Sequence, residues 1–305
     1  MLKLGSRNLV SLRDLLVKKL SLHNNRGLST SHTASRYRLK DKVALITGAA
    51  TGIGKATASE FISNGAKVVI ADIQSKLGQA TTSELGPNAT FISCDVTQES
   101  DVAAAVDFTV AQYGHLDIMF NNVGISGFTP FSIVDLNLKD FDLVINTNVR
   151  GVIAGIKHAS RVMIPQRSGS ILCTASVAGV IGGLAPATYS ISKFAIIGTV
   201  KSVAAELSRY GIRVNCISPF VTATAFVLEE MAMMFPGVEA SRLVQIAHSV
   251  GKFEGANCET LDIAKAALYL GSDDAKYVSG HNLVVDGGFS SFKSLDFAAP
   301  DQVAN

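Results

Sequence analysis

The chain has 305 residues, which is enough for one large domain or two ordinary ones. Hydrophobic residues make up 48% and charged residues 17%, so a sizeable core can form and extensive disorder is excluded. The net charge of +2 arises from residues 1–40, which contain nine Lys or Arg and one acid. The remainder is slightly acidic and has no basic surplus that would suggest a nucleic-acid partner. No apolar stretch reaches the roughly 18 residues of a membrane span, and the four scattered cysteines form neither a C-x-x-C pair nor a metal site.

The first 40 residues resemble an organelle transit peptide. Basic residues lie among four leucines at helical spacing, Leu9, Leu12, Leu16 and Leu20. This amphipathic, acid-poor composition is typical of targeting segments, and residues 26–29 resemble the cleavage context of mitochondrial presequences. We therefore expect a mitochondrial protein. A plastid address, or a cytosolic protein with a disordered extension, is the alternative.

A glycine-rich turn follows the first predicted strand. The apolar run 43–46 predicts a buried strand, and a helical stretch through Phe61 follows the turn. Strand, glycine turn and helix in this order predict a dinucleotide site, because glycine lets the backbone approach a pyrophosphate and helix-start N–H groups bind its charge. A simple structural turn is the alternative, since the spacing is Gly-x-x-x-Gly-x-Gly. The expected contacts are Gly48, Thr51, Gly52, Ile53 and Gly54.

The second predicted strand, 67–71, ends in Asp72. A carboxylate at this place accepts a hydrogen bond from the adenosine ribose 2′-OH and repels a 2′-phosphate. Ile73 follows where an NADP site favours Arg, and Thr51 stands in the turn in place of a basic residue. These residues favour NAD over NADP, and a strand-end Asp that merely starts a turn is the alternative.

Strands and helices then alternate. A third strand, 89–94, ends at Asp95 and Val96, a helix covers 99–113, and a fourth strand, 116–120, runs into residues 121–124. This alternation predicts a parallel, doubly wound α/β sheet, whose ligands bind beyond the carboxyl ends of the strands. Asp95, Val96, Asn122 and Gly124 are therefore further candidates for the cofactor site.

Tyr189 and Lys193 lie four residues apart in a predicted helix, so their side chains share one helix face. A cation close to a phenol favours the phenolate and lowers its pKa, which suits general acid–base catalysis. A solvated surface pair is the alternative for this pair alone. Ser176 ends a predicted strand at 170–174, and Asn148 lies in the preceding helix. Both could be purely structural.

The motifs together resemble the short-chain dehydrogenase/reductase family over residues 41–290. They occur in the family's order: the glycine turn, Asp95, residues 121–124, Asn148, Ser176, residues 189–193, and Pro219 after a sixth strand, 213–217. Residues 215–220 and 277–288 look most like the plant branch that includes xanthoxin, secoisolariciresinol and borneol dehydrogenases and zerumbone synthase. Val123 in place of Ala and Val221 in place of Gly depart from the usual pattern.

The resemblance implies a single Rossmann-fold catalytic domain at 41–290 with a seven-stranded parallel sheet, followed by a tail at 291–305. It also implies an NAD-dependent oxidoreductase. Tyr189 would exchange the substrate proton, Lys193 would lower the pKa of Tyr189 and bind the nicotinamide ribose, Ser176 would bind the substrate oxygen, and Asn148 would position a relay water. Pro219, Thr222 and Thr224 would border the nicotinamide, with Val221 putting the two threonine contacts in doubt. A homodimer or homotetramer is expected.

Residues 220–255 are rich in Met, Phe, Leu and Val, and pliable apolar side chains suit a lipophilic substrate. We therefore expect a secondary alcohol on a terpenoid or steroid-like skeleton and its ketone. An ordinary helical lid that packs on the core is the alternative for this segment. Two other functions stay open, an NADPH-dependent 3-oxoacyl-carrier-protein reductase and a non-catalytic, regulatory member of the same fold.

Overall fold

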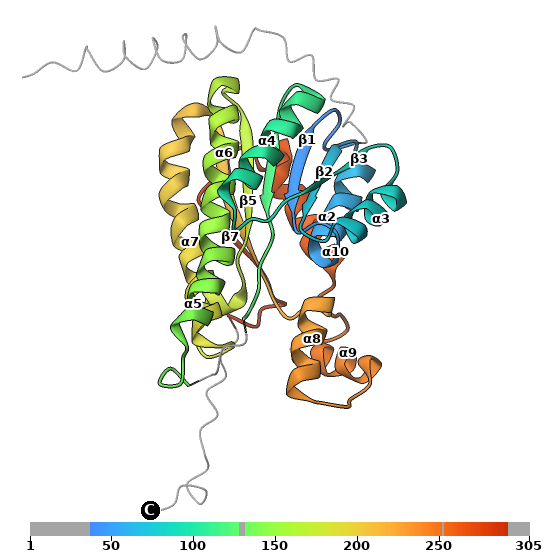
Figure 1. Ribbon diagram of the computed structural model, residues 1–305, viewed down its shortest axis with the longest axis vertical. Coiled ribbons are helices and arrows are strands. Elements are labelled where there is room, and N and C mark those ends of the chain that lie inside the picture. Colours follow the sequence, from blue (N-terminus) through green and yellow to red (C-terminus); the bar gives the residue numbers. More distant parts are fainter. Residues whose placement is uncertain (1–36, 128–131, 252, 292–305) are drawn as a thin grey trace, which may run out of the picture. The chain divides into compact units, whose positions relative to one another are not determined.

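The computed structural model describes residues 37–127, 132–251 and 253–291 of the chain. Seven parallel strands form one sheet in the order β3-β2-β1-β4-β5-β6-β7, which confirms the predicted doubly wound fold (Figure 1). The strands are β1 (Val43–Thr47), β2 (Lys67–Asp72), β3 (Ala89–Ser93), β4 (Ile118–Asn121), β5 (Gly169–Thr174), β6 (Ile212–Pro219) and β7 (Asn282–Val285).

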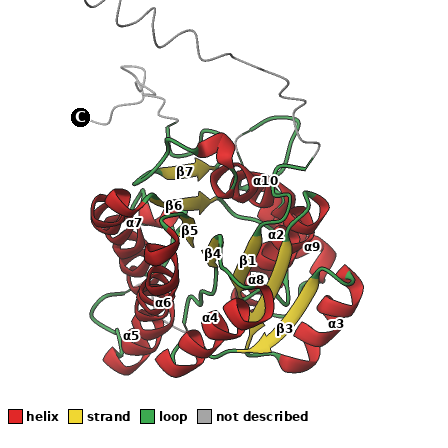
Figure 2. Cartoon of the chain, turned by 90° about the horizontal axis from the view of Figure 1, so that it is seen from above, coloured by secondary structure: helices red, strands yellow, loops and turns green. Residues whose placement is uncertain are grey.

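Helices cover both faces of the sheet (Figure 2). The α-helices are α2 (Gly52–Ser63), α3 (Ser75–Leu85), α4 (Glu99–Tyr113), α5 (Leu138–Ile145), α6 (Gly151–Gln166), α7 (Ala187–Leu207), α8 (Ala225–Met234), α9 (Ala240–Ser249) and α10 (Thr260–Gly271). The turns η1 (Asn146–Arg150) and η2 (Val177–Gly179) precede α6 and α7. Figures 1 and 2 place α4, α6 and α7 on one side of the sheet and α2 and α10 on the other.

Two separate apolar cores explain why the strands read as continuous hydrophobic runs. In β1, Leu45 packs into the core beneath α4, α6 and α7, whereas Ala44 and Ile46 pack into the core beneath α2 and α10. Successive strand residues point to opposite faces, and both faces of this sheet are covered, so nearly every position of β1 is apolar. Leu39 is also buried in the second core, two residues ahead of the expected domain start at 41.

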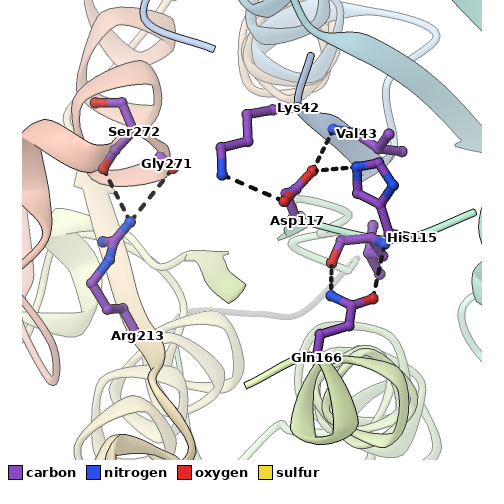
Figure 3. A network of polar contacts seen from close by, with 9 residues as sticks. Lys42, Val43, His115, Asp117, Gln166, Arg213, Gly271 and Ser272 are labelled. Atoms are coloured by element: carbon purple, nitrogen blue, oxygen red, sulfur yellow. Dashed lines mark hydrogen bonds and ion pairs between the residues drawn. The ribbon is translucent and has the colours of Figure 1, made fainter. Parts of the chain in front are cut away.

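Polar contacts fix the amino ends of the strands, opposite the edge where ligands bind (Figure 3). Asp117, just before β4, accepts a hydrogen bond from the backbone N–H of Val43 at 2.8 Å and pairs with Lys42 and His115. Arg213 in β6 donates to the backbone carbonyls of residues 270–272 at the end of α10. These contacts lie far along the strands from the predicted site residues, so we read them as structural.

The structure bears on three features of the sequence. Cys94, Cys173 and Cys216 are buried free thiols. The apolar segment 220–255 forms α8 and α9, which pack on each other through Met231, Leu243 and Ala247. Of the helices within the described ranges, none is both long and apolar enough to cross a membrane. The expected transit peptide at 1–40 and the tail at 291–305 lie outside the described residues except for residues 37–40 and Ser291.

Candidate active site

The glycine turn after β1 has the geometry that a dinucleotide requires. Gly48 and Gly52 adopt positive φ values of 65° and 56°, which favour glycine. A Cβ on Gly54 would lie only 2.3 Å from the carbonyl oxygen of Gly48, so the turn can close only around glycine. Thr51 is the N-cap of α2 but makes no side-chain capping bond, and the first N–H groups of the helix thus remain suited to an anion. Ile53 packs against the core behind the turn.

Asp72 braces this turn from the end of β2. One carboxylate oxygen accepts a hydrogen bond from the N–H of Ala50 at 3.0 Å, and the other accepts from the N–H of Gln74, also at 3.0 Å. The residue is 5% exposed, whereas Ile73 beside it is 64% exposed. Each carboxylate oxygen has a further lone pair, so Asp72 can hold the turn and still accept from a ribose hydroxyl.

Asn122 links the glycine turn to the neighbouring strands. Its Nδ2 donates to the carbonyl oxygens of Thr47 and Gly48 at 3.2 Å each, and its Oδ1 accepts from the hydroxyl of Thr174 at 3.1 Å. The carbonyl of Thr174 in turn accepts from Nζ of Lys193 at 2.9 Å. One polar chain therefore joins the expected dinucleotide turn to the expected catalytic lysine.

The structure brings Tyr189, Lys193 and Ser176 together at the carboxyl edge of the sheet. Tyr189 and Lys193 lie one turn apart on α7, with Nζ of Lys193 5.4 Å from the centre of the Tyr189 ring. Ser176 caps η2 by accepting from the N–H of Ala178 at 3.1 Å, and its side chain, as a hydrogen-bonding neighbour, lowers the pKa of Tyr189. A phenol and a hydroxyl that are neighbours at this edge can both act on one substrate oxygen.

The electrostatics differ from the sequence-based expectation that Lys193 lowers the pKa of Tyr189. Burial raises the pKa of Tyr189 to about 12, and the hydrogen bond from Ser176 opposes that rise. Burial also lowers the pKa of Lys193 to about 8. Desolvation penalises the charged form of both groups, so the phenol of the free protein is a proton donor at neutral pH.

Asn148 lies in η1, where the helix widens to a π-turn between α5 and α6. Its side chain joins the backbone of Ile125 to the hydroxyl of Ser192. Oδ1 accepts from the N–H of Ile125 at 2.8 Å, while Nδ2 donates to the Ile125 carbonyl at 2.7 Å and to the Ser192 hydroxyl at 3.0 Å. A Cβ on Gly124 would lie 3.2 Å from Nζ of Lys193, so glycine allows the backbone at 124–125 to approach the lysine closely.

The remaining expected residues lie at the same edge with other immediate partners. Asp95 accepts from the N–H and the hydroxyl of Thr97 in a tight turn, and Val96 is buried behind it. Pro219 ends β6. The Thr222 hydroxyl donates to the Phe220 carbonyl at 3.1 Å.

Thr224 caps α8, and its methyl group lies about 3.5 Å from the position of a Cβ on Gly52. The start of α8 therefore lies against the glycine turn. Val221, which departs from the family pattern, packs into the small core between α8 and α9.

Sequence reasoning missed residues that hold the site. Thr174 accepts from Lys193, and Ser192 joins Asn148 to α7. Gly179 lets η2 approach α7, because a Cβ there would lie 2.6 Å from the backbone carbonyl carbon of Lys193. Thr174 ends the strand that precedes Ser176, and Ser192 lies within the motif at 189–193, so their position in the chain was the available signal.

A cavity of about 280 Å³ lies beside the site, between α9 and the ends of β6 and β7. Phe220, Val221, His248 and Cys258 are among its lining residues. It contains neither the glycine turn nor Ser176, Tyr189 or Lys193. We therefore locate the chemistry at Tyr189 and not in this cavity.

Comparisons with known proteins agree with this geometry. The profile of the family described as "Enoyl-(Acyl carrier protein) reductase" matches residues 48–290. Secoisolariciresinol dehydrogenase of Forsythia intermedia is 48% identical over 265 residues, which is 86% of this chain and 94% of that protein. Mitochondrial borneol dehydrogenase of Lavandula x intermedia is 49% identical over 253 residues, 83% of this chain and 92% of that protein.

A solved structure also matches. Levodione reductase is 32% identical, with a TM-score of 0.78 over 83% of this chain and 99% of that one. The two plant dehydrogenases are proteins of the branch that residues 215–220 and 277–288 indicated.

Proposed function

The chain belongs to the short-chain dehydrogenase/reductase family, and from this premise we propose that it interconverts a lipophilic secondary alcohol and its ketone with NAD. Family membership and the named relatives make it an oxidoreductase enzyme that uses a nicotinamide dinucleotide. This excludes the non-catalytic alternative. The observation that carries the proposal is the meeting of Ser176, Tyr189 and Lys193 beside the glycine turn.

The choice of NAD rests on Asp72. Its carboxylate lies against the glycine turn through the Ala50 N–H, where a 2′-phosphate would meet a negative charge. Ile73 is exposed and carries no charge to compensate for that repulsion. The same two residues argue against an NADPH-dependent 3-oxoacyl-carrier-protein reductase.

Each residue of the site has its own role in the proposed reaction. When bound, the dinucleotide supplies hydride exchange with the substrate carbon. The phenol of Tyr189 donates a proton to the carbonyl oxygen in reduction and takes it back from the alcohol in oxidation. Ser176 donates a hydrogen bond to the same oxygen and stabilises the charge that develops on it. Lys193 holds positive charge behind the phenol, and Asn148 fixes the segment 124–125 beside that lysine.

An apolar substrate fits the side of the site that α8 covers. Phe226 on α8 lies 6.5 Å from Tyr189, ring centre to ring centre, so an aromatic face borders the reacting group. Met233 and Met234 at the end of α8 are more than half exposed and can adapt their shape. The names of the relatives, secoisolariciresinol and borneol dehydrogenases, agree with an alcohol on a terpenoid or similar skeleton.

Two further proposals concern the whole protein. The basic N-terminal segment supports a mitochondrial address, and one relative is named as mitochondrial. Ile191 and Phe194 are apolar and nearly half exposed on one face of α7. Such a face supports a homodimer or homotetramer that pairs this helix with a second copy.

A coupled assay tests the proposed function. The purified protein is screened with NAD and with NADP over terpenols, sterols and short polar alcohols, and NADH or NADPH formation is followed. We expect turnover with NAD and preference for lipophilic secondary alcohols. A clear preference for the short polar alcohols, or for NADP, would contradict the corresponding part of the proposal.

A further inference from the structure

Glu230 on α8 faces the catalytic tyrosine. It follows Phe226 by four residues, so the two side chains share one face of the helix. That face is the one turned toward the site, because the Phe226 ring lies 6.5 Å from the Tyr189 ring. Glu230 has no role in the proton transfer proposed for Tyr189, Ser176 and Lys193.

The carboxylate of Glu230 is incompletely paired. Its Oε1 is buried and has no hydrogen-bond partner within the described part of the chain. The preceding residue, Glu229, is exposed and solvated, as glutamates on a surface helix usually are. A buried acceptor without a partner destabilises the folded protein, and more so when it is charged. Glu230 is therefore costly to the free protein, and a ligand that donates a hydrogen bond would remove that cost.

Electrostatics support the same placement. Burial raises the pKa of Glu230 above its ordinary value, and the side chain of Ser126, in the segment after β4, opposes this rise. The charge of Glu230 in turn raises the pKa of Tyr189. The carboxylate, Ser126 and the phenol thus belong to one electrostatic environment, and a ligand that reaches Tyr189 lies within reach of Glu230.

We propose that Glu230 is a specificity-determining residue that accepts a hydrogen bond from a second polar group of the substrate. That group is a hydrogen-bond donor, a hydroxyl or a protonated amine, on the part of the molecule that faces α8 while the reacting oxygen lies at Tyr189 and Ser176. The inference rests on the proposed alcohol–ketone chemistry and refines it. The substrate is an apolar skeleton with one additional donor, not a hydrocarbon with a lone alcohol.

Matched substrates test this inference. The probes are trans-4-methylcyclohexanol, trans-1,4-cyclohexanediol and trans-4-aminocyclohexanol, which place a methyl, a hydroxyl or an ammonium at one position. We expect the wild-type enzyme to have a higher kcat/KM for the diol or the amino alcohol than for the methyl compound. Glu230→Leu should reduce that preference roughly ten- to hundredfold and leave kcat/KM for the methyl compound unchanged or higher.

Two further variants sharpen the result. Glu230→Gln keeps an acceptor without charge, so it should retain preference for the diol and lose preference for the ammonium, which identifies the donor. Glu229→Gln, one residue away on the exposed side, should leave all ratios as in the wild type. Equal ratios in wild type and Glu230→Leu, or a wild-type preference for the methyl compound, would overturn the inference. Absence of turnover on every alcohol with either dinucleotide would instead contradict the proposed function and remove the basis of the inference.

Discussion

Nζ of Lys193 lies 2.9 Å from the carbonyl oxygen of Thr174, so the lysine of α7 is tied to the last residue of β5. Lys193 is 2% exposed, and burial lowers its pKa to about 8. The fold thus holds an ammonium that it has largely desolvated. A buried charged group destabilises the folded state, and such groups are typical of functional sites, where activity requires them.

Replacing Lys193 with Met should abolish turnover and change how stability depends on pH. Below pH 8 the lysine is charged in both the folded and the unfolded states, and the folded state carries the cost of burying the charge. Between pH 8 and 10.5 only the unfolded state still binds the proton, so the free energy of unfolding of the wild type rises with pH. The fall in pKa corresponds to roughly 3 kcal/mol.

Urea unfolding at pH 7 and pH 10 measures this effect. The wild type should gain roughly 2–3 kcal/mol relative to Lys193→Met between the two pH values. Lys201→Met, an exposed lysine on the same helix, should show no such difference. A parallel pH dependence of wild type and Lys193→Met would show that the lysine is not desolvated.

Gly54→Ala should weaken dinucleotide binding at least tenfold, because the new Cβ would lie 2.3 Å from the Gly48 carbonyl oxygen and 2.8 Å from Nδ2 of Asn122. The turn must open, and the helix-start N–H groups then lose their position. Titration of NADH fluorescence measures the affinity. Gly182→Ala, where a Cβ meets nothing within 4 Å, is the control and should bind normally. Unchanged affinity in Gly54→Ala would place the dinucleotide elsewhere.

Ile73→Arg should raise the use of NADP about tenfold, because a guanidinium next to Asp72 can pair with a 2′-phosphate. Ile73 is 64% exposed, so the melting temperature should not change. Ile73→Gln supplies the length without the charge and should leave the kcat/KM ratio of the two cofactors as it was. If the wild type already prefers NADP, the role given to Asp72 is wrong.

Asp72→Asn should destabilise the protein by about 1–3 kcal/mol. Both carboxylate oxygens accept backbone N–H groups, from Ala50 and Gln74, and an amide can replace only one of these acceptors. Thermal unfolding measures the loss, which added NAD should recover only in part. A variant as stable as the wild type would mean that these two hydrogen bonds contribute little.

Phe194→Glu should reduce the size of the assembly in solution. Phe194 is 46% exposed on α7, and a carboxylate there would be buried against the second copy that we propose. Analytical ultracentrifugation compares this variant with Leu77→Glu, which changes an exposed apolar residue on α3. Only Phe194→Glu should dissociate. A monomeric wild type, or an unaffected assembly, would reject α7 as the interface.

The sequence predicted the parallel sheet well because strands covered on both faces have a simple signature. Every residue of β1 is buried, and β2 is buried except for Lys67, so these strands read as uninterrupted apolar runs between turns. The π-turn at 146–150 was not predicted, because one extra residue per turn leaves no mark on hydrophobic spacing.

The sequence predicted that these side chains lie close together, but not their electrostatics. Helical spacing places Tyr189 and Lys193 on one face, and the structure shows them so. Spacing cannot report burial, which raises one pKa and lowers the other. Glu230 lies outside every family motif. Its place at the site can be inferred only from the structure, in which α8 brings it toward Tyr189.

The activity of Tyr189→Phe, measured together with its NADH affinity, tests the account most directly. Phe preserves the ring but removes the hydroxyl to which we assign proton exchange with the substrate oxygen, so kcat should fall by roughly 10²–10⁴. The dissociation constant for NADH should stay within about twofold, because the glycine turn and Asp72 are untouched. A Tyr189→Phe enzyme with the wild-type rate would contradict the assignment of the reaction to this site.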